Sequence, residues 1–591
     1  MRTRRGITGL TALGAAGALL AAAACAPGDP DEETAADAPG LEGCEEDPNE
    51  CNSGEVEDGG EITWVVNALP GAWSSQSAAG GSVYNIQMLE GVIPFTGHWL
   101  PDGETYEYNM DLLAEEPELV DEDADQYEVD WVIAEDAEWN DGTPITYEDI
   151  EVTWMMNSND ESLCEGCASR STAATEIIED ISSDDDDDKT FTVTYEDQYA
   201  EWFGLFSQHS VAGGFYPAHL AEEEEGLDLD DPEDVGEFFE WLDTEMPEYS
   251  GGPFELADGD LENQVVKQPN ENYYGEAPNL DTIVVEFHDD EGGWIPALTN
   301  DEIHGATPAQ INQDVLEELE GMEGVHTDIG PGPSWEHVDF NMDVAEFEDE
   351  TLRQAMFTAI DVEDIVDRNF GEVYPEAEPK TNPAFFNDDD YHEDVVTDTG
   401  HGSGDADAAL SMLEDEGYEM EDETLTLDGD EIGPFTLRST STDIRDTSME
   451  LIQSHLADIG VEIQIETTED LGETLAEADF DLMQFGWNTS PFFVATPFQQ
   501  WHSDSPSNYG GYANDEVDEL TEQVASAPDL DEAAELSNEA AAIVSEEAYV
   551  LPLLDQPDYT FVTDEYANIR DHLASSSRAS YNVGEWGMLA E

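Results

Sequence analysis

The chain has 591 residues, more than one small hydrophobic core can organise, so two or three domains are expected. Its 146 Asp and Glu residues against 13 Lys and Arg give a formal net charge of -133, which would repel phosphate and so excludes a nucleic-acid binder. Because 39% of the residues are apolar and aromatic residues occur along the whole chain, the composition favours a packed fold over disorder.

The first 25 residues have the pattern of an export signal. Three Arg residues precede an apolar run that is too short to span a membrane, and small residues follow up to Cys25. The ending Ala-Ala-Ala-Cys resembles a bacterial lipobox, although Ala22 stands where Leu is usual. We therefore expect a lipid on Cys25, with simple cleavage and release as the alternative.

Four further cysteines are spaced for two local disulfides. Cys44 with Cys51 and Cys164 with Cys167 suit an exported protein, although four cysteines allow three connectivities. A zinc site is the alternative, but neither spacing has a neighbouring His pair. Beyond the export signal no run is long and apolar enough to cross a bilayer, so the mature protein should be soluble and at most tethered.

Residues 26–58 are acidic, contain Gly and Pro, and have almost no large apolar side chains. This composition predicts a disordered tether that one disulfide would pin. Order is expected to begin at EITWVVNAL, residues 61–69, a strand that should enter the core.

The stretch from Tyr127 to Asn157 predicts a strand, a turn and a capped helix. Asn140–Gly142 form the turn, because Gly tolerates positive φ and Asx side chains bond their own backbone. Thr146 is the expected N-cap of the helix, with Asp149 at its N3 position. Nothing in the unit requires a catalytic role. The preceding strand has the two-residue apolar period of a half-buried strand, at Tyr127, Val129, Trp131 and Ile133.

The acidic run SSDDDDDKT, residues 182–190, lies between two segments that favour strands. A solvated turn is the simplest interpretation. Calcium binding is the alternative, but consecutive carboxylates lack the spaced ligands and the Gly of a calcium-binding loop.

A strand, a helix and a second strand follow one another near residue 435. FTLRS reads as a strand, residues 443–459 carry apolar side chains at helical spacing, and Gly460 ends the helix. VEIQI then alternates as a strand, so the order predicts a parallel βαβ element. Another strand, DFDLMQFGW, follows, and the whole chain is predicted to be α/β.

Several segments match, in order, the motifs of one known family. The early signature Trp-x-Asp-Gly-x-Pro-x-Thr-x-x-Asp-Val stands here as WNDGTPITYEDI, residues 139–150. The later matches are PAHL (217–220), SGGPFEL (250–256), NYYGEAPNLDTIVVEF (272–287), WEHVDFNMD with LRQAMFTAIDVEDIV (335–366), FDLMQFGW and SNYGGYANDEVDEL. Together they resemble the bacterial ABC-transporter solute-binding proteins of family 5, the dipeptide and oligopeptide class. Each motif is weak alone, but their number and order over about residues 60–565 are specific.

The resemblance implies a periplasmic-binding-protein-like α/β fold of class II, with two lobes, a hinge between them and an extra domain. The implied order is an export signal (1–25), the acidic tether (26–58), lobe I (59–330) with the extra domain at about 98–205, lobe II (331–550), and a segment returning to lobe I (551–591). The tryptophans of residues 139–154 would then be packing residues of the extra domain.

The resemblance also places a ligand between the lobes. Trp487 matches a tryptophan that lines the cleft in the family, and three residues later peptide binders carry an Asp that holds the ligand's α-ammonium group. This chain has Ser490 there, which removes the charge-assisted bond. Asn488 or Ser490 would give neutral hydrogen bonds instead, so a blocked peptide or an uncharged solute becomes more plausible than a free peptide.

Other ligand-binding candidates come from loops near the first strand. Asn67 and Trp73 follow that strand, where ligand-facing loops begin in open α/β lobes. Glu90 matches an acidic residue that often precedes Gly in the family. Ordinary packing or capping is the alternative for each of these residues, and Arg438 is expected to hold a carboxylate, more readily the protein's own than a ligand's. The remaining candidates are Tyr84 and Asn85.

The function that follows from the resemblance is an importer subunit without covalent chemistry. It would bind a peptide-like solute, close, and deliver the solute to the transmembrane subunits of an ABC permease, as a monomer held by lipid at Cys25 on the extracytoplasmic face of the cell membrane. No cofactor, catalytic residue or metal ligand is expected. Nickel, haem and an oligosaccharide remain alternatives on the same fold.

Two other function classes have weaker support in the sequence. A secreted hydrolase could use paired carboxylates, but such pairs arise everywhere by chance among 146 acidic residues. The nucleophile and metalloprotease motifs of common hydrolases are missing. A calcium-binding surface protein would need spaced Asp/Asn loops or repeats, which the sequence does not contain.

The charge predicts dependence on salt. At roughly 1 M salt the Debye length is about 3 Å, so surface carboxylates hardly sense one another, whereas in dilute buffer they repel. We expect a protein from a salt-loving bacterium that loses structure on dialysis into dilute buffer, measured by circular dichroism. Full retention of the spectrum would contradict this.

Overall fold

The computed structural model describes residues 40–590, except 42, 45–46, 78, 121–126, 172–173, 184–187, 211–212, 222–225, 289–290, 309–311, 422, 489 and 573–574. Cys25 and the export signal lie outside the described residues, so lipidation remains a prediction. Of the helices in these described ranges, none combines the length and apolarity that a membrane crossing requires.

A long mixed sheet organises the fold. Within the described ranges it has ten strands in the order β18-β17-β19-β13-β20-β12-β2-β11-β10-β9. Their bounds are β2 Glu61–Val66, β9 Phe254–Asp260, β10 Gln264–Pro269, β11 Thr282–Phe287, β12 Gly305–Ala306, β13 Val325–Phe340, β17 Phe435–Thr440, β18 Ile463–Thr468, β19 Leu482–Asn488 and β20 Val550–Thr563.

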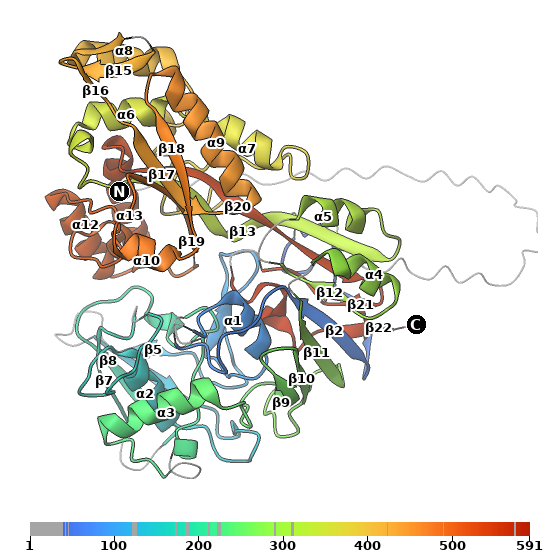
Figure 1. Cartoon of the computed structure of the whole chain (residues 1–591). Coiled ribbons are helices and arrows are strands. Elements are labelled where there is room, and N and C mark those ends of the chain that lie inside the picture. Colours follow the sequence, from blue (N-terminus) through green and yellow to red (C-terminus); the bar gives the residue numbers. More distant parts are fainter. Residues whose placement is uncertain are drawn as a thin grey trace, which may run out of the picture. The chain divides into compact units, whose positions relative to one another are not determined.

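Two long antiparallel strands, β13 and β20, connect the two halves of this sheet (Figure 1). At one end β20 pairs with β12 through Phe561 and Val562. At the other end β13 pairs with β19 from Ser334 to Phe340. We call the strands β12, β2, β11, β10 and β9 the β2 half, and the strands β18, β17 and β19 the β19 half. Backbone hydrogen bonds through β13 and β20 join the two halves.

The β2 half contains the predicted first strand. EITWVVNAL forms β2, which pairs in parallel with β11 and β12, and Ile62 and Trp64 are fully buried, so the prediction of a core strand is confirmed. The nearby helices are α1 Val83–Leu89, α4 Trp294–Thr299 and α5 Gln313–Glu320.

A four-stranded sheet of order β5-β6-β8-β7 contains the strand, turn and helix predicted at 127–157. In β6 the predicted face is buried, and Thr146 caps α2, with the Asp149 carboxylate accepting the Thr146 backbone N–H at 2.8 Å. The acidic residues 184–187 between β7 and β8 lie outside the described residues. The bounds are β5 Glu118–Leu119, β6 Tyr127–Val132, α2 Tyr147–Asn157, β7 Ile178–Ser183, β8 Thr190–Tyr195 and α3 Pro232–Thr244.

The predicted βαβ element is confirmed in the β19 half. β17 leads into α9 (Asp443–Asp458) and then into β18, which is parallel to β17, while β19 pairs in parallel on the other side. Gly460 follows the helix with a φ of 77°, as a glycine end signal requires. The other helices here are α6 Glu350–Ala359, α7 Val362–Phe370, α8 Ala406–Glu416, α10 Leu471–Ala476, α11 Thr496–Trp501, α12 Asp515–Ala525 and α13 Leu530–Glu546.

The prediction of a disordered tether up to residue 58 is wrong for its last part. Leu41 is buried, and β1 (Val56–Glu57) pairs with the C-terminal strand β22 (Gly587–Leu589). A disulfide joins Cys44 to Cys51, and a second joins Cys164 to Cys167, which is the local pairing among the three connectivities. The low apolar content of this segment does not predict its order, because residues distant in the sequence supply the packing partners. The remaining strands are β3 Gly97–Trp99, β4 Tyr106–Tyr108, β14 Tyr418–Glu421, β15 Thr424–Leu427, β16 Asp430–Glu431 and β21 Tyr566–Ala567.

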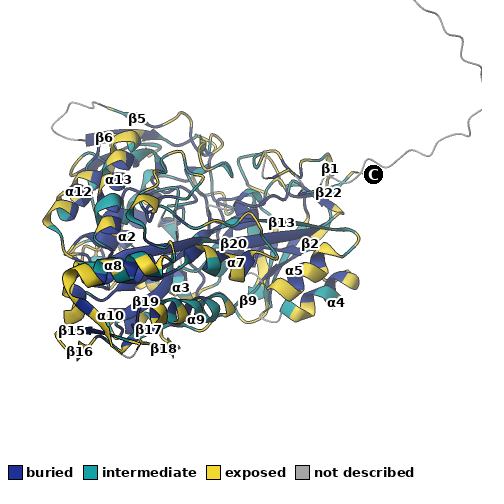
Figure 2. Cartoon of the chain, turned by 90° about the horizontal axis from the view of Figure 1, so that it is seen from above, coloured by how far each residue is buried: buried dark blue, intermediate teal, exposed yellow. Residues whose placement is uncertain are grey.

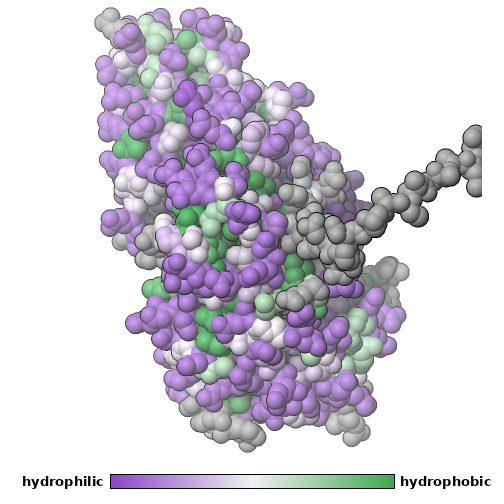
Figure 3. Space-filling view, turned by 90° about the vertical axis from the view of Figure 1, so that its right-hand side faces the viewer, coloured by the Kyte–Doolittle hydropathy of each residue, from purple (hydrophilic) through white to green (hydrophobic). Residues whose placement is uncertain are grey.

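Burial follows the long strands. Figure 2 shows β13 and β20 largely buried, whereas helices such as α4, α8 and α12 have exposed outer faces. The face in Figure 3 is mostly hydrophilic, with smaller hydrophobic patches toward its middle. The carboxylates therefore gather mainly on outward surfaces.

Several carboxylates on the long strands are nevertheless buried, and each has a basic partner. Arg578 binds both Asp558 of β20 and Asp571, and all three side chains are at most 5% exposed. Burial raises the pKa of Asp558 to about 6, while Arg578 acts in the opposite direction. The other pairs are Lys380 with Asp555 of β20 (2.7 Å) and Arg445 with Glu336 of β13 (2.7 Å).

We expect Arg578→Met to lower the free energy of unfolding by about 3–5 kcal/mol, because it leaves two buried carboxylates without a cation. Arg368→Met is the control: its pair with Asp364 is exposed, so it should cost at most about 1 kcal/mol. Denaturant unfolding in molar salt measures both. Equal effects of the two substitutions would contradict the role of the buried pair.

Candidate ligand-binding site

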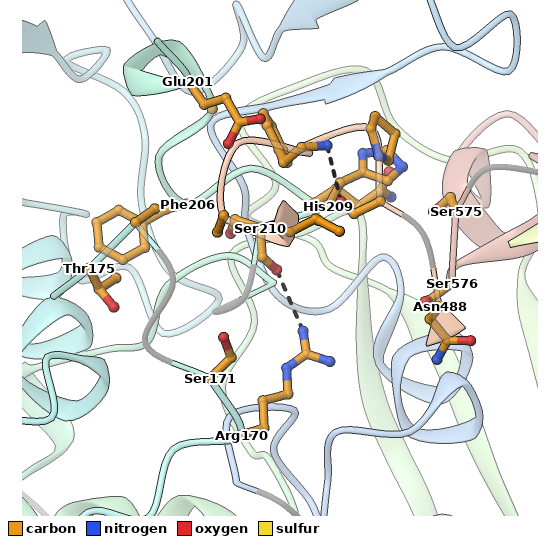
Figure 4. A pocket seen from close by; sticks show the side chains of 18 of the residues that line it. Arg170, Ser171, Thr175, Glu201, Phe206, His209, Ser210, Asn488, Ser575 and Ser576 are labelled. Atoms are coloured by element: carbon orange, nitrogen blue, oxygen red, sulfur yellow. Dashed lines mark hydrogen bonds between the residues drawn. The ribbon is translucent and has the colours of Figure 1, made fainter. Parts of the chain in front are cut away.

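A cavity of about 370 Å³ lies between segments beside the four-stranded sheet, the start of α1 and the segment that begins at the end of β19, and we call it the Arg170 cavity. This volume is at the lower end of the usual range for small-molecule sites. Its lining comes from residues 81–86, 170–175, 199–210, 488–499 and 575–577 (Figure 4). Segments far apart in the sequence thus share one concave site.

Arg170 is the basic side chain of the lining. Its backbone N–H donates to the Gln76 carbonyl at 2.7 Å, and its guanidinium donates to the Ser210 carbonyl at 3.5 Å (Figure 4). Gly81 lies so close that a Cβ there would be 2.7 Å from the Arg170 Cδ, so glycine leaves room for the arginine stem. Burial lowers the pKa of Arg170, and Tyr216 acts in the opposite direction.

Glu201 connects the two sides of the cavity. One carboxylate oxygen accepts the backbone N–H groups of Phe493 (2.7 Å) and Val494 (3.0 Å), and the other accepts the Tyr199 hydroxyl (2.9 Å). Glu201 is 3% exposed, and burial raises its pKa to about 7. The segment after β19 is thereby held to the segment that contains Glu201.

Phe492 adds an aromatic contact to the same junction. Its ring centroid lies 5.9 Å from that of Trp99, 6.4 Å from Tyr106 and 6.0 Å from Phe203. A Cβ at Gly204 would come within 2.2 Å of the Phe492 ring, so only glycine fits there without a shift. Neither Glu201 nor Phe492 was among the residues that the sequence singled out.

Three histidines that are distant in the sequence come together beside the cavity. The rings of His209 and His572 have centroids 4.9 Å apart, and both bond the backbone of Trp99. Burial lowers the pKa of His98 and of His572 to about 4 and that of His209 well below its usual value. Burial thus disfavours the charged form of all three side chains.

Of the residues predicted from the family cleft motif, two line the cavity. These are Asn488 and Ser490. The Ser490 hydroxyl accepts the Phe492 N–H at 3.2 Å, and Asn488 accepts the Ser334 hydroxyl at 2.6 Å. Trp487 is not part of this lining; its ring stacks on Tyr509 with centroids 5.9 Å apart.

The candidates near the first strand have structural contacts. Asn85 is buried and bonds the backbone of Gly71 and Ala72, and Glu90 is buried and accepts hydrogen bonds from Gln208 and Ser577. Burial raises the pKa of Glu90 to about 7. Asn67 donates to Glu291 at 3.1 Å. Helix α1 instead presents Val83 and Ile86 to the Arg170 cavity, whose lining does not include Asn67, Trp73, Tyr84, Asn85 or Glu90.

Arg438 binds two of the protein's own carboxylates, Glu466 and Asp479, and lies outside the cavity lining. These contacts favour the expectation that Arg438 holds the protein's own carboxylates over a role in ligand binding.

Among the residues that the structure describes, one cluster has the composition of a metal site, namely Asp301, His304 and Glu565. The Nδ1 of His304 accepts the Thr63 N–H at 2.8 Å, so a neutral ring carries its proton on Nε2, which faces Asp301 at 3.6 Å. A metal on Nε2 would have to displace that proton. The cluster is better described as two acids near a histidine whose ring accepts a backbone N–H.

The distribution of acidic residues along the sequence indicates this site, although the overall composition does not. Beyond its first 28 residues, the four longest segments without Asp or Glu are 62–89, 202–221, 482–503 and 572–584. They supply all described lining residues except those at 170–175, 199 and 201. The local loss of acidic residues thus marks the cavity.

Comparison with known proteins shows which proteins the chain resembles in sequence and fold. The family model of bacterial extracellular solute-binding proteins, family 5 (middle region), matches residues 110–509. The oligopeptide-binding protein OppA of Mycobacterium tuberculosis (strain H37Rv) is 25% identical over 546 residues, covering 90% of this chain and 86% of OppA.

Two solved structures have the same fold. The periplasmic EDTA-binding protein EppA superposes with a TM-score of 0.83 at 26% identity, covering 92% of this chain and 99% of EppA. The oligopeptide-binding protein AppA of Bacillus subtilis, solved with a nonapeptide, superposes with a TM-score of 0.71 at 18% identity and covers 91% of this chain and all of AppA. The predicted periplasmic-binding-protein fold is confirmed.

We expect Glu201→Gln to change the pH dependence of stability. The folded-state pKa of Glu201, about 7, lies above the usual 4.5, so the folded protein binds this proton more tightly than the unfolded chain. The stabilisation is complete below pH 4.5 and is lost as pH rises through 7. The difference in unfolding free energy between wild type and variant should therefore shift in favour of wild type by about 2 kcal/mol from pH 8 to pH 5. Parallel pH profiles of denaturant unfolding would contradict this.

Proposed function

The chain belongs to family 5 of the bacterial extracellular solute-binding proteins, and we propose that it captures peptide-like solutes in the Arg170 cavity for delivery to an ABC permease. The family match covers more than half of the chain, and the chain is a binding protein rather than an enzyme. The proposed mechanism is binding followed by closure of two lobes, with no covalent step.

One observation carries this proposal: segments beside the four-stranded sheet and α1 line the cavity together with the segment that begins at the end of β19. Arg170 and Glu201 stand on one side, while Asn488, the last residue of β19, and Ser490 stand on the other. The two halves of the long sheet are linked by β13 and β20, so bending of this strand pair would open and close the cavity. We propose lobes at residues 59–330 and 331–550, with 551–591 returning to the first.

The similarity to OppA and AppA, which are named for oligopeptide binding, supports a peptide-like ligand. Ser490 and Asn488 offer neutral hydrogen-bonding groups at the place where the resemblance predicts an Asp. A peptide with a blocked amino terminus would suit these groups better than a free one, because no charge-assisted bond to an ammonium is available from Ser490.

A second candidate function is the binding of a metal chelate. The similarity to the EDTA-binding protein supports this function. Its TM-score of 0.83 is higher than that of AppA, which is 0.71. Haem and oligosaccharide binding remain alternatives on the same fold, and nickel would reach the cavity with a chelating solute.

The proposal includes the setting of the protein. Family membership makes it extracytoplasmic. We propose that a lipid on Cys25 holds it at the cell membrane, that it acts as a monomer, and that its carboxylate-rich surface is adapted to high salt. The transmembrane subunits of a permease would be its partners.

The experiment is thermal melting in molar salt with di- to hexapeptides, N-acetylated peptides, oligosaccharides and nickel. A solute that binds only the folded state raises stability by about 2.7 kcal/mol at a hundredfold excess over its dissociation constant. We expect a shift with peptide-like solutes, reduced in Asn488→Ala with Ser490→Ala and retained in Arg368→Gln, which lies on α7. No shift with any solute would contradict the proposal.

A further inference from the structure

The Arg170 cavity differs in charge from the rest of the protein. About one residue in four of the whole chain is acidic, yet Glu201 is the single acidic residue among the described residues of the lining. The neighbouring sequence at 172–173, 211–212, 489 and 573–574 is also uncharged. Acidic residues are therefore much scarcer in the described lining than in the chain as a whole.

The acidic group that remains is already engaged. Glu201 is buried, and its two oxygens accept the N–H groups of Phe493 and Val494 and the Tyr199 hydroxyl. Pairing with a ligand ammonium would compete with these bonds, which also hold the two sides of the cavity together. The described lining thus offers no carboxylate that could receive an ammonium group without breaking the junction.

The cationic group of the lining is Arg170. Its guanidinium donates to the Ser210 carbonyl at 3.5 Å, and the same lining contains Ser171 and the hydroxyl-rich segment 575–577 (Figure 4). Guanidinium with hydroxyl and amide donors is the group set that recognises carboxylates.

We propose that the Arg170 cavity takes a small anionic solute, a carboxylate-bearing molecule without a free ammonium group, and that Arg170 pairs with its carboxylate. This inference rests on the proposed solute-binding function and specifies its ligand class. Peptides blocked at the amino terminus and polycarboxylate chelates share this chemistry. Free peptides lack it, since their ammonium group finds no partner at Ser490.

The scarcity of acid around the cavity has a physical reason under this proposal. A carboxylate ligand must approach a protein of net charge -133, and at roughly 1 M salt charges more than about 3 Å away are screened. Only the groups in direct contact then decide whether an anion is accepted. Removing carboxylates from the lining alone is therefore sufficient.

The test is a matched ligand series in molar salt, measured by isothermal titration calorimetry. Tri-alanine, N-acetyl-tri-alanine and N-acetyl-tri-alanine amide share their side chains and differ only in end charges. We expect N-acetyl-tri-alanine to bind at least tenfold more tightly than either of the others. Metal-free EDTA and nickel-loaded EDTA extend the series to the chelates, and tighter binding of either than of the acetylated peptide would identify the chelate as the source of the carboxylates.

Variants connect the preference to the residues. Arg170→Gln should lose at least tenfold in affinity for N-acetyl-tri-alanine, Arg170→Lys should recover part of it, and Arg368→Gln should bind as wild type does. Ser490→Asp should reverse the order in favour of free tri-alanine. Thermal melting without ligand shows whether each variant is folded, and Ser490→Asp tests the preference even if Arg170→Gln does not fold.

The outcomes separate the two proposals. Preferential binding of free tri-alanine, or equal binding of the acid and the amide, would overturn the anionic class and leave the solute-binding function intact. An unchanged affinity in folded Arg170→Gln would overturn the role of Arg170. Failure of every solute in both panels would overturn the proposed peptide-like function itself, and the anionic class with it.

Discussion

Neutralisation of buried carboxylates on two long strands is the interaction on which the rest of the structure depends. Glu336 on β13 and Asp555 and Asp558 on β20 are largely buried, and Arg445, Lys380 and Arg578 bind them. A buried carboxylate without a cation is costly, and the chain has only 13 Lys and Arg residues. Three of the scarce cations are therefore placed where β13 and β20 join the two halves of the sheet.

The same scarcity of cations gives the cavity its character. Arg170 lines a cavity whose described lining comes mainly from segments without Asp or Glu. The surface can be rich in carboxylates because salt screens them, but a desolvated site cannot, since screening is weak there. The outer surface is therefore rich in carboxylates, whereas the cavity lining has few. Glu201 is held at the junction by backbone N–H groups rather than by a cation.

Local physics made much of the fold predictable. The alternation of Tyr127, Val129 and Trp131, the cap at Thr146 and the βαβ order after residue 435 depend on neighbours within a few residues, and all were found as predicted. The tether was misjudged because Leu41 joins a hydrophobic core built from the rest of the chain, and β1 pairs with β22 near the C-terminus. Asn85 and Glu90 were given a ligand role because their motif was visible, whereas their buried contacts were not.

By itself the sequence determined the family, the α/β elements, the carboxylate-rich surface and the position of Ser490, because these are local patterns or ordered motifs. Only the tertiary structure decided which of the polar residues share a cavity. Arg170, Glu201 and Asn488 are separated by tens to hundreds of residues, and tertiary contacts such as those of Glu201 with the Phe493 and Val494 N–H groups bring their segments together. Composition shows how many charges a chain has, whereas folding decides which of them face one another.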